Sequence, residues 1–220
     1  MRYEPVPNVA VAFSTPMLHT GGTALLREVD VSFADRGLHL IRGVNGSGKT
    51  TLLHALAGLM PDYQQQVSWW GQRVSELSVQ ERARLRFMLF QDSTSDVPWT
   101  VREYVALATR RPSGSKTNLA VENALDKVSM QEKSQQLVST LSGGEWARVQ
   151  LAQALASGTK LLMCDEPDAA LDDEGRTTLV LLLQALPDIT CIVISHDPSR
   201  FESAADSVTT VSNGLVMQVS

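Results

Sequence analysis

The chain has 220 residues, of which 43% are hydrophobic and 20% charged, and this balance is typical of a globular protein rather than a disordered chain. Its formal net charge of −5 disfavours the broad positive surface that nucleic-acid-binding proteins need. We therefore expect no nucleic acid among its partners.

The apolar segments are too short for a membrane-spanning helix. The longest of them, residues 179–186, falls well short of the roughly 20 residues that such a helix requires. The first 13 residues lack a basic start followed by a long apolar run, so we expect no signal peptide. Cys164 and Cys191 each lie in an apolar run, which is typical of reduced core thiols. We expect a cytosolic chain; if it works at a membrane, other chains must supply the spans.

Two runs near the N-terminus, residues 8–13 and 29–33, alternate apolar and polar side chains and predict an antiparallel β flap. Residues 38–44 are a short continuous apolar run, which is typical of a strand buried on both faces of a parallel sheet. The next segment, 49–59, repeats apolar residues at three and four spacing and predicts a helix. This strand and helix begin an expected α/β core.

The segment GVNGSGKT, which joins this strand and helix, matches the phosphate-binding pattern GxxxxGK[ST]. Its glycines let backbone N–H groups turn toward an anion, and the helix start adds the positive end of its dipole. We expect Lys49 to contact the β- and γ-phosphates of a nucleotide, and the Thr50 hydroxyl to bind Mg²⁺. The alternative, an ordinary glycine turn, is disfavoured by the lysine and threonine in this context. The predicted loop consists of Gly43, Val44, Asn45, Gly46, Ser47, Gly48, Lys49 and Thr50.

The middle of the chain, from about residue 92 to 140, has a helical pattern instead. Residues 100–111 and 119–130 predict two helices, with a polar loop at 111–117 between them. We expect this helical lobe to be an insertion, so that residues 1–91 and 141–220 form one α/β core. The whole chain, residues 1–220, is then a single domain.

A second short apolar strand is expected at residues 160–167, and it delivers two adjacent carboxylates, Asp165 and Glu166. Asp165 is suited to hold Mg²⁺, directly or through water. Glu166 is suited to orient or deprotonate an attacking water. Taken alone, such a pair is usually the start of a solvated loop. Together with the phosphate-binding loop, it is the second half expected of a nucleotide hydrolase.

The rest of the predicted core continues the alternation of strands and helices. Helices are expected at 146–156 and 175–186, and a third apolar strand is expected at 189–197. This alternation is typical of a doubly wound parallel sheet, which binds ligands at the carboxyl ends of its strands. Further along, Asn213-Gly214 lies between two β runs and predicts a hairpin.

Residues 141–145 read LSGGE and stand at a predicted helix start, where backbone N–H groups lack intrahelical partners and suit a phosphate. Ser142 adds a hydroxyl, although a serine-capped helix without a ligand is the alternative. Several motifs now stand in order: GVNGSGKT, Gln91 in FQDS, LSGGE, LLMCDEP, AALDD and His196 in ISHD. In this order and over nearly the whole length, the chain resembles the ATP-binding subunit of an ABC transporter.

The resemblance implies a P-loop NTPase fold and ATP hydrolysis coupled to transport, with ATP and Mg²⁺ as cofactors. It implies that Gln91 senses Mg²⁺ and water, that His196 contacts the γ-phosphate, and that Asp172 crosses a dimer interface. In this family the LSGGE element closes over ATP held by a second copy. The resemblance thus implies a homodimer with two shared ATP sites, bound to transmembrane permease subunits at the cytoplasmic face of the membrane. The further nucleotide-binding residues that it implies are Thr51, Ser142, Gly143, Gly144 and Glu145.

Two features depart from the family pattern. The family usually stacks an aromatic residue on adenine, and the spacing here lands near His19, with Phe13 and Tyr3 as alternatives. Asp168 stands where the family usually has a small hydroxyl or apolar residue, and it adds a negative charge close to Glu166. Neither departure removes a catalytic group.

The cargo is indicated only by residues 67–107 and by LSGGEW, which resemble importers of iron–siderophore, haem or cobalamin. Import of a metal chelate is therefore our expectation, and an ABC exporter stays open. A soluble ABC ATPase is disfavoured, because this chain has neither a coiled-coil insert nor a second core. A GTPase is disfavoured because no NKxD string is present. Residues 92–104 are expected to hold the cleft for a helix of the membrane subunit.

Overall fold

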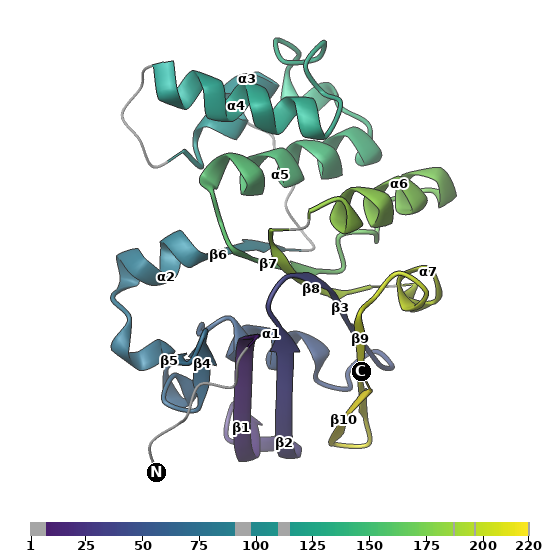
Figure 1. Ribbon diagram of the computed structural model, residues 1–220. Helices are drawn as coiled ribbons and strands as arrows, with labels where there is room; N and C mark the ends of the chain where they lie inside the picture. Colours follow the sequence, from purple (N-terminus) through teal and green to yellow (C-terminus); the bar gives the residue numbers. More distant parts are fainter. Residues whose placement is uncertain (1–7, 91–97, 110–114, 187, 196, 220) are drawn as a thin grey trace.

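The computed structural model describes residues 8–90, 98–109, 115–186, 188–195 and 197–219, and it is built on one curled sheet (Figure 1). Its strands are β1 (Val9–Thr20), β2 (Thr23–Ala34), β3 (Gly37–Arg42), β4 (Val67–Trp69), β5 (Gln72–Arg73), β6 (Arg86–Leu89), β7 (Leu161–Asp165), β8 (Thr190–Ile194), β9 (Ser207–Ser212) and β10 (Leu215–Val219). Its α-helices are α1 (Lys49–Leu56), α2 (Val79–Leu85), α3 (Val101–Ala106), α4 (Ser115–Lys127), α5 (Gly143–Ser157), α6 (Asp173–Gln184) and α7 (Pro198–Glu202).

The parallel half of the sheet has the order β9-β3-β8-β7-β6. The three predicted strands of the α/β core are confirmed as β3, β7 and β8, and every residue of β7 and β8 is buried. The parallel strand β6 was not predicted. It lies at the edge of the sheet and is only partly buried, so its apolar signal is weak.

The N-terminal flap is antiparallel, as predicted, but its strands are longer than expected and are continuous with the core sheet. β1 and β2 pair with each other, and β2 lies next to β10. β10 pairs in turn with β9 through the predicted hairpin, in which Asn213 and Gly214 have φ values of 52° and 76°. Positive φ at both positions is what a tight two-residue hairpin turn requires. The sheet consequently runs unbroken from the flap to β3, the strand before the phosphate-binding loop.

Two clusters of buried apolar side chains lie on opposite faces of the sheet, because successive strand residues point opposite ways. In β7, Leu162 and Cys164 belong to the cluster that includes α5 and α6. Leu161 and Met163 belong to the cluster that includes α1 and the flap. Cys164 and Cys191 are both buried and free, as expected of core thiols.

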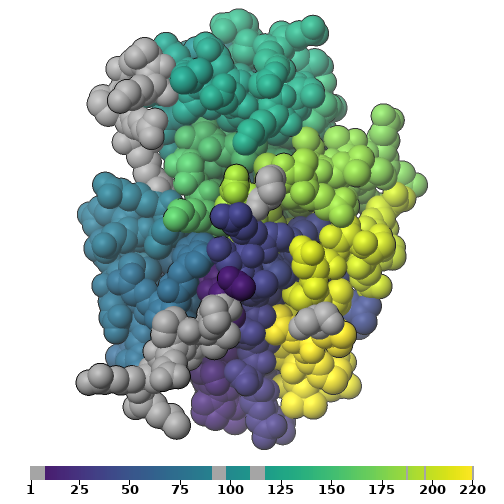
Figure 2. Space-filling model, viewed as in Figure 1, coloured from purple at the N-terminus to yellow at the C-terminus, as the bar shows by residue number. Residues whose placement is uncertain are grey.

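Helices α3 and α4 pack on α5 and form the helical lobe, which lies above the sheet in Figures 1 and 2. The bounds differ from those predicted. α3 ends at Ala106, whereas the predicted helix ran to residue 111. α4 begins at Ser115, inside the segment predicted as a polar loop. Polarity alone misled the prediction, because the polar residues at this point form the first turn of an amphipathic helix.

Two helix boundaries depend on local signals. α1 ends at Leu56 rather than at residue 59, and Gly58 follows with a φ of 66°, a conformation that ends a helix. Helix α2 was missed, although Ser78 and Glu81 form a capping box at its start, a signal that the sequence does contain. Within the described residues, no helix is both long and apolar enough to cross a membrane.

Candidate nucleotide-binding site

The phosphate-binding loop lies between β3 and α1 and is shaped by backbone that only glycine adopts easily. Gly43 has a φ of 153°, and a Cβ placed there would lie 2.2 Å from the carbonyl oxygen of Val211. The loop leads directly from β3 into α1. Its first position therefore has no room for a side chain. This close approach explains why the pattern begins with glycine.

The Lys49 side chain closes this loop from inside. It is 6% exposed, and its Nζ atom donates hydrogen bonds to the carbonyl oxygens of Gly43 at 3.0 Å and Val44 at 3.1 Å. The ammonium group thus lies at the centre of the curved backbone. This position is compatible with a contact between Lys49 and a phosphate, which stays a prediction.

Thr50 and Asp165 meet at the carboxyl end of β7. The Thr50 hydroxyl donates a hydrogen bond to Oδ1 of Asp165 at 3.2 Å, and Asp165 is 7% exposed. Hydroxyl and carboxylate oxygens are the ligands that Mg²⁺ prefers, so this pair fits a magnesium ion bound beside the phosphates. Gln91, the third predicted magnesium contact, lies outside the described residues.

Glu166 faces the same hollow, which has a volume of about 410 Å³. Its φ of 51° is left-handed, and its N–H donates a hydrogen bond to the carbonyl oxygen of Ile194 at 2.9 Å. His196 and Gln91, the two further predicted catalytic residues, lie outside the described residues. The hollow is lined by Thr20, Leu25, Asn45, Gly46, Gly48, Lys49, Thr50, Thr51 and Glu166.

The structure excludes Phe13, one of the three residues considered for stacking on adenine. Phe13 is 1% exposed and packs edge-on against Tyr63, so it is unavailable for stacking on adenine. Thr20 and Leu25, from the two strands of the flap, line the hollow and were missed by the sequence reading. They carry no motif, and only the pairing of β1 with β2 brings them to the loop. Tyr3 lies outside the described residues, and His19 is exposed.

The LSGGE element forms the first turn of α5. The Ser142 hydroxyl accepts a hydrogen bond from the Glu145 N–H at 3.3 Å, and Glu145 accepts one from the Ser142 N–H at 2.9 Å. Lys133 forms an ion pair with Glu145. The Lys133 ammonium first, and the Ser142 N–H second, lower the pKa of Glu145 to about 2. Glu145 is therefore ionised and tied to both neighbours at neutral pH.

A second hollow, of about 390 Å³, opens at this turn. It also meets the start of α6, where the Asp172 side chain caps the helix by accepting a hydrogen bond from the Gly175 N–H at 2.8 Å. Two helix N-termini therefore border one hollow, and both favour an anion. It is lined by Ser142, Gly143, Gly144, Ala147, Arg148, Ala170, Asp172, Glu174, Gly175, Thr178 and Leu179.

The two hollows are separate sites. Among the described residues that line them, none is shared between the hollow at Lys49 and the hollow at Ser142. The structure thus groups the predicted residues into two sets. Lys49, Thr50, Asp165 and Glu166 come together in one set, and the LSGGE residues join Asp172 in the other.

Comparison with known proteins identifies the family. The family described as ABC transporter matches residues 26–169. The chain is 33% identical to the sulfate/thiosulfate import ATP-binding protein CysA of Synechocystis sp., over 90% of this chain and 57% of that protein. It is 36% identical to the vitamin B12 import ATP-binding protein BtuD of Vibrio atlanticus, over 81% of this chain and 75% of that protein. The chain thus spans little more than half the length of the CysA protein.

A solved structure with a similar fold also comes from an ABC transporter. CbiO1 from Clostridium perfringens, described as part of the ABC transporter complex CbiONQ, matches with a TM-score of 0.87 and 22% sequence identity. The match covers 96% of this chain and 88% of that one. At this level of identity the likeness concerns the fold, and it includes the P-loop core, the flap and the helical lobe. The family match over residues 26–169 and the 36% identity with the BtuD protein establish that this chain belongs to the ABC transporter family of ATP-binding proteins.

Proposed function

We propose that the chain binds and hydrolyses ATP and thereby powers an ABC transporter, most specifically an importer of a metal chelate. One observation carries this proposal: a single chain has two hollows suited to phosphate, with Lys49 in one and Ser142 in the other, and they share no described lining residue. Separate sites of this kind suit a twofold dimer in which each ATP contacts Lys49 of one copy and Ser142 of the other.

The chemistry follows from the residues around Lys49. Its ammonium, with the loop N–H groups from Gly43 to Thr51, neutralises and orients the phosphates. Thr50 and Asp165, with Gln91 assigned from the family, would hold a magnesium ion, which would supply charge stabilisation at the phosphates. Glu166 orients or deprotonates the attacking water, a step typically worth about 10²–10⁴ in rate. His196 is assigned, again from the family, to the γ-phosphate.

In the proposed dimer, ATP hydrolysis shifts the equilibrium between the closed and the open arrangement of the two copies. ATP bridges the two copies, whereas ADP lacks the γ-phosphate that the N–H groups at Ser142, Gly143 and Gly144 would bind. Hydrolysis therefore removes the preference for the closed dimer, and a difference of this kind can shift a conformational equilibrium. Asp172, beside Ser142 in the second hollow, is suited to contact the other copy.

Transmembrane permease subunits are the proposed further partners, with the dimer bound at the cytoplasmic face of the membrane. The family match and the names of the relatives, which are import ATP-binding proteins, support this assignment. A metal-chelate cargo is supported by the vitamin B12 relative and by the resemblance of residues 67–107.

The proposal is tested with the Glu166→Gln variant, which removes the carboxylate that acts on water and keeps the residues that bind ATP. We expect turnover to fall to a small residual rate, ATP to stay bound, and gel filtration with Mg-ATP to give a dimer, whereas ADP gives a monomer. The control is Glu76→Gln, at an exposed position in the 3-10 turn at Val74–Glu76, which should behave as the unmodified chain. A Glu166→Gln chain that hydrolyses ATP at the full rate and stays monomeric would refute the proposal.

A further inference from the structure

Hydrogen bonds hold the turn after β7 to the end of β8 at two points. The Glu166 N–H donates to the carbonyl oxygen of Ile194 at 2.9 Å. Two residues later, Oδ2 of Asp168 accepts a hydrogen bond from the Ser195 hydroxyl at 2.7 Å, and the Asp197 N–H approaches it at 3.4 Å. The turn that carries Glu166 is therefore held against the adjacent strand on both sides of Pro167.

The Asp168 side chain is fully buried, with 0% of its surface exposed, and Ser195 is 4% exposed. A buried carboxylate is costly unless hydrogen bonds satisfy it, and a hydrogen bond to a charged group is worth more than a neutral one. The bond between Asp168 and Ser195 is consequently among the strongest local constraints on this turn.

Glu166 needs such a constraint, because its backbone is left-handed, with a φ of 51°. A residue other than glycine is strained in this conformation, and it stays there only when its surroundings fix it. In this conformation Glu166 lines the phosphate hollow. Release of the turn would let the backbone relax and would turn the carboxylate away.

We propose that Asp168 is a positioning residue for Glu166: its hydrogen bond with Ser195 fixes the left-handed turn that holds the Glu166 carboxylate in the phosphate hollow. This inference rests on the proposed function, because it assigns Asp168 a part in the step that Glu166 performs.

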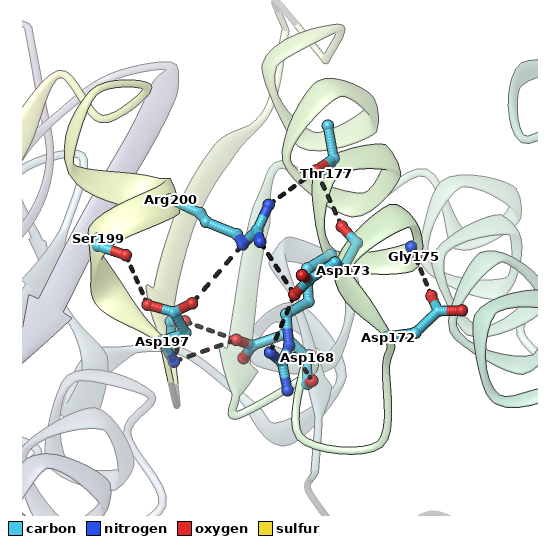
Figure 3. A network of polar contacts seen from close by, with 10 residues as sticks. Asp168, Asp172, Asp173, Gly175, Thr177, Asp197, Ser199 and Arg200 are labelled. Carbon is cyan, nitrogen blue, oxygen red and sulfur yellow. Dashed lines mark hydrogen bonds and ion pairs between the residues drawn. The ribbon is translucent and has the colours of Figure 1, made fainter.

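The polar network continues outward from Asp197, but its outer contacts are exposed. Ser199 donates to Asp197 at 2.6 Å, and Arg200 pairs with Asp197 at 3.6 Å and with Asp173, at the start of α6, at 2.9 Å (Figure 3). Ion pairs at exposed positions usually contribute little, since water and salt screen them. The buried bond between Asp168 and Ser195 is therefore the contact expected to position Glu166.

The test compares steady-state ATP hydrolysis by Asp168→Ala and by the unmodified chain. We expect kcat to fall by about 10- to 100-fold, because small misplacements of a catalytic group cost up to about 10²-fold, while KM for ATP changes less than about twofold. Asp168→Asn keeps an acceptor oxygen for Ser195 and should recover most of the rate. Ser199→Ala, which removes an exposed hydroxyl of the same network, is the matched control and should leave both constants unchanged.

A second measurement distinguishes a loss of Glu166 positioning from general damage to the enzyme. In the Glu166→Gln background, adding Asp168→Ala should not lower the residual rate further, because the carboxylate to be positioned is already gone. Likewise, the double variant Asp168→Ala, Ser195→Ala should be no slower than the worse of its single variants. Should Asp168→Ala fail to fold, Ser195→Ala, which removes only the donor, carries the comparison.

The inference is overturned if Asp168→Ala keeps the full kcat, if it raises KM at an unchanged kcat, or if it slows the Glu166→Gln chain by the same factor as the unmodified chain. These outcomes differ from failure of the proposed function, which would appear as a Glu166→Gln chain that does not dimerise with ATP. The dimerisation experiment does not depend on Asp168.

Discussion

At the scale of single residues, the ion pair between Lys133 and Glu145 determines the charge of the LSGGE turn. Glu145 stands in the turn proposed to bind a phosphate, and its pKa of about 2 means that it is ionised at neutral pH. A lone carboxylate there would repel an anion. Lys133 lies in the loop before the 3-10 turn at Val138–Thr140, and it supplies the compensating positive charge.

We therefore expect Lys133→Met to weaken ATP-dependent dimerisation of the Glu166→Gln chain by about tenfold, which corresponds to about 1.4 kcal/mol. Adding Glu145→Gln removes the carboxylate charge that Lys133 no longer compensates and should restore most of the affinity. Sedimentation equilibrium with Mg-ATP measures both effects. A loss that Glu145→Gln does not restore would mean that Lys133 acts through something other than the Glu145 charge.

The residues that carry chemistry were predictable to different degrees, for a physical reason. Lys49 and Thr50 are placed by a loop of eight consecutive residues, so their spacing alone indicates their role. Thr20 and Leu25 reach the same hollow only because β1 pairs with β2, and no local pattern records that pairing. Lys133 was missed likewise, because its contact with Glu145 spans 12 residues and depends on the loop between them.

At the scale of elements, three helices begin with the same device. α2, α3 and α5 each have a capping box, in which a serine or threonine and a glutamate three residues later exchange hydrogen bonds. At α2 the device only starts a surface helix. At α5 the same atoms also border the second hollow. The caps of α2 and α5 consist of the same residue types, but only the cap of α5 borders a hollow. Substitutions in the two caps can therefore separate an effect on stability from an effect on ligand binding.

Ser78→Ala and Ser142→Ala should each lower the free energy of unfolding by about 1 kcal/mol, because each removes an N-cap. Only Ser142→Ala should also weaken ATP-dependent dimerisation in the Glu166→Gln background. Urea unfolding and gel filtration on the same two samples check the pair of effects. Equal dimerisation by both variants would contradict the assignment of Ser142 to a shared nucleotide.

Element types followed from the sequence better than element ends. β3, β7 and β8 were foreseen because strands buried on both faces are continuously apolar. β6 and α2 were missed because each is short and half exposed, so burial leaves little pattern in their residues. The order of strands depends on contacts between distant segments. Local patterns therefore could not predict that the flap joins the core through β10 and β9.

At the scale of the whole molecule, the separation of the two hollows determines how damaging substitutions, or lesions, in two different chains combine within one dimer. In the proposed dimer, each site takes Lys49 from one copy and Ser142 from the other. A chain with Lys49→Ala and a chain with Ser142→Phe would pair so that both lesions fall in one site. The second site of that heterodimer would then be intact.

We expect that, in the Glu166→Gln background, neither of these two variants dimerises alone with Mg-ATP, and that a mixture forms heterodimers that retain about one ATP each. The control places the same lesions differently: a chain with both substitutions is mixed with a chain that has neither. Both sites of that heterodimer are damaged, so it should not form. Bound radiolabelled ATP and native mass spectrometry measure the outcome. Heterodimers that form in the control mixture as readily as in the first mixture would exclude a site shared between copies.

The hydrogen bonds from the Lys49 ammonium to the carbonyl oxygens of Gly43 and Val44 have a kinetic consequence. They fix the curved backbone of the phosphate-binding loop, so the loop already has its binding conformation when a triphosphate arrives. Little chain entropy is then left to lose during capture. Capture of this kind is limited by diffusion and electrostatic attraction rather than by a slow rearrangement. In the proposed dimer, the slower events of the cycle would then be the association and dissociation of the two protein copies.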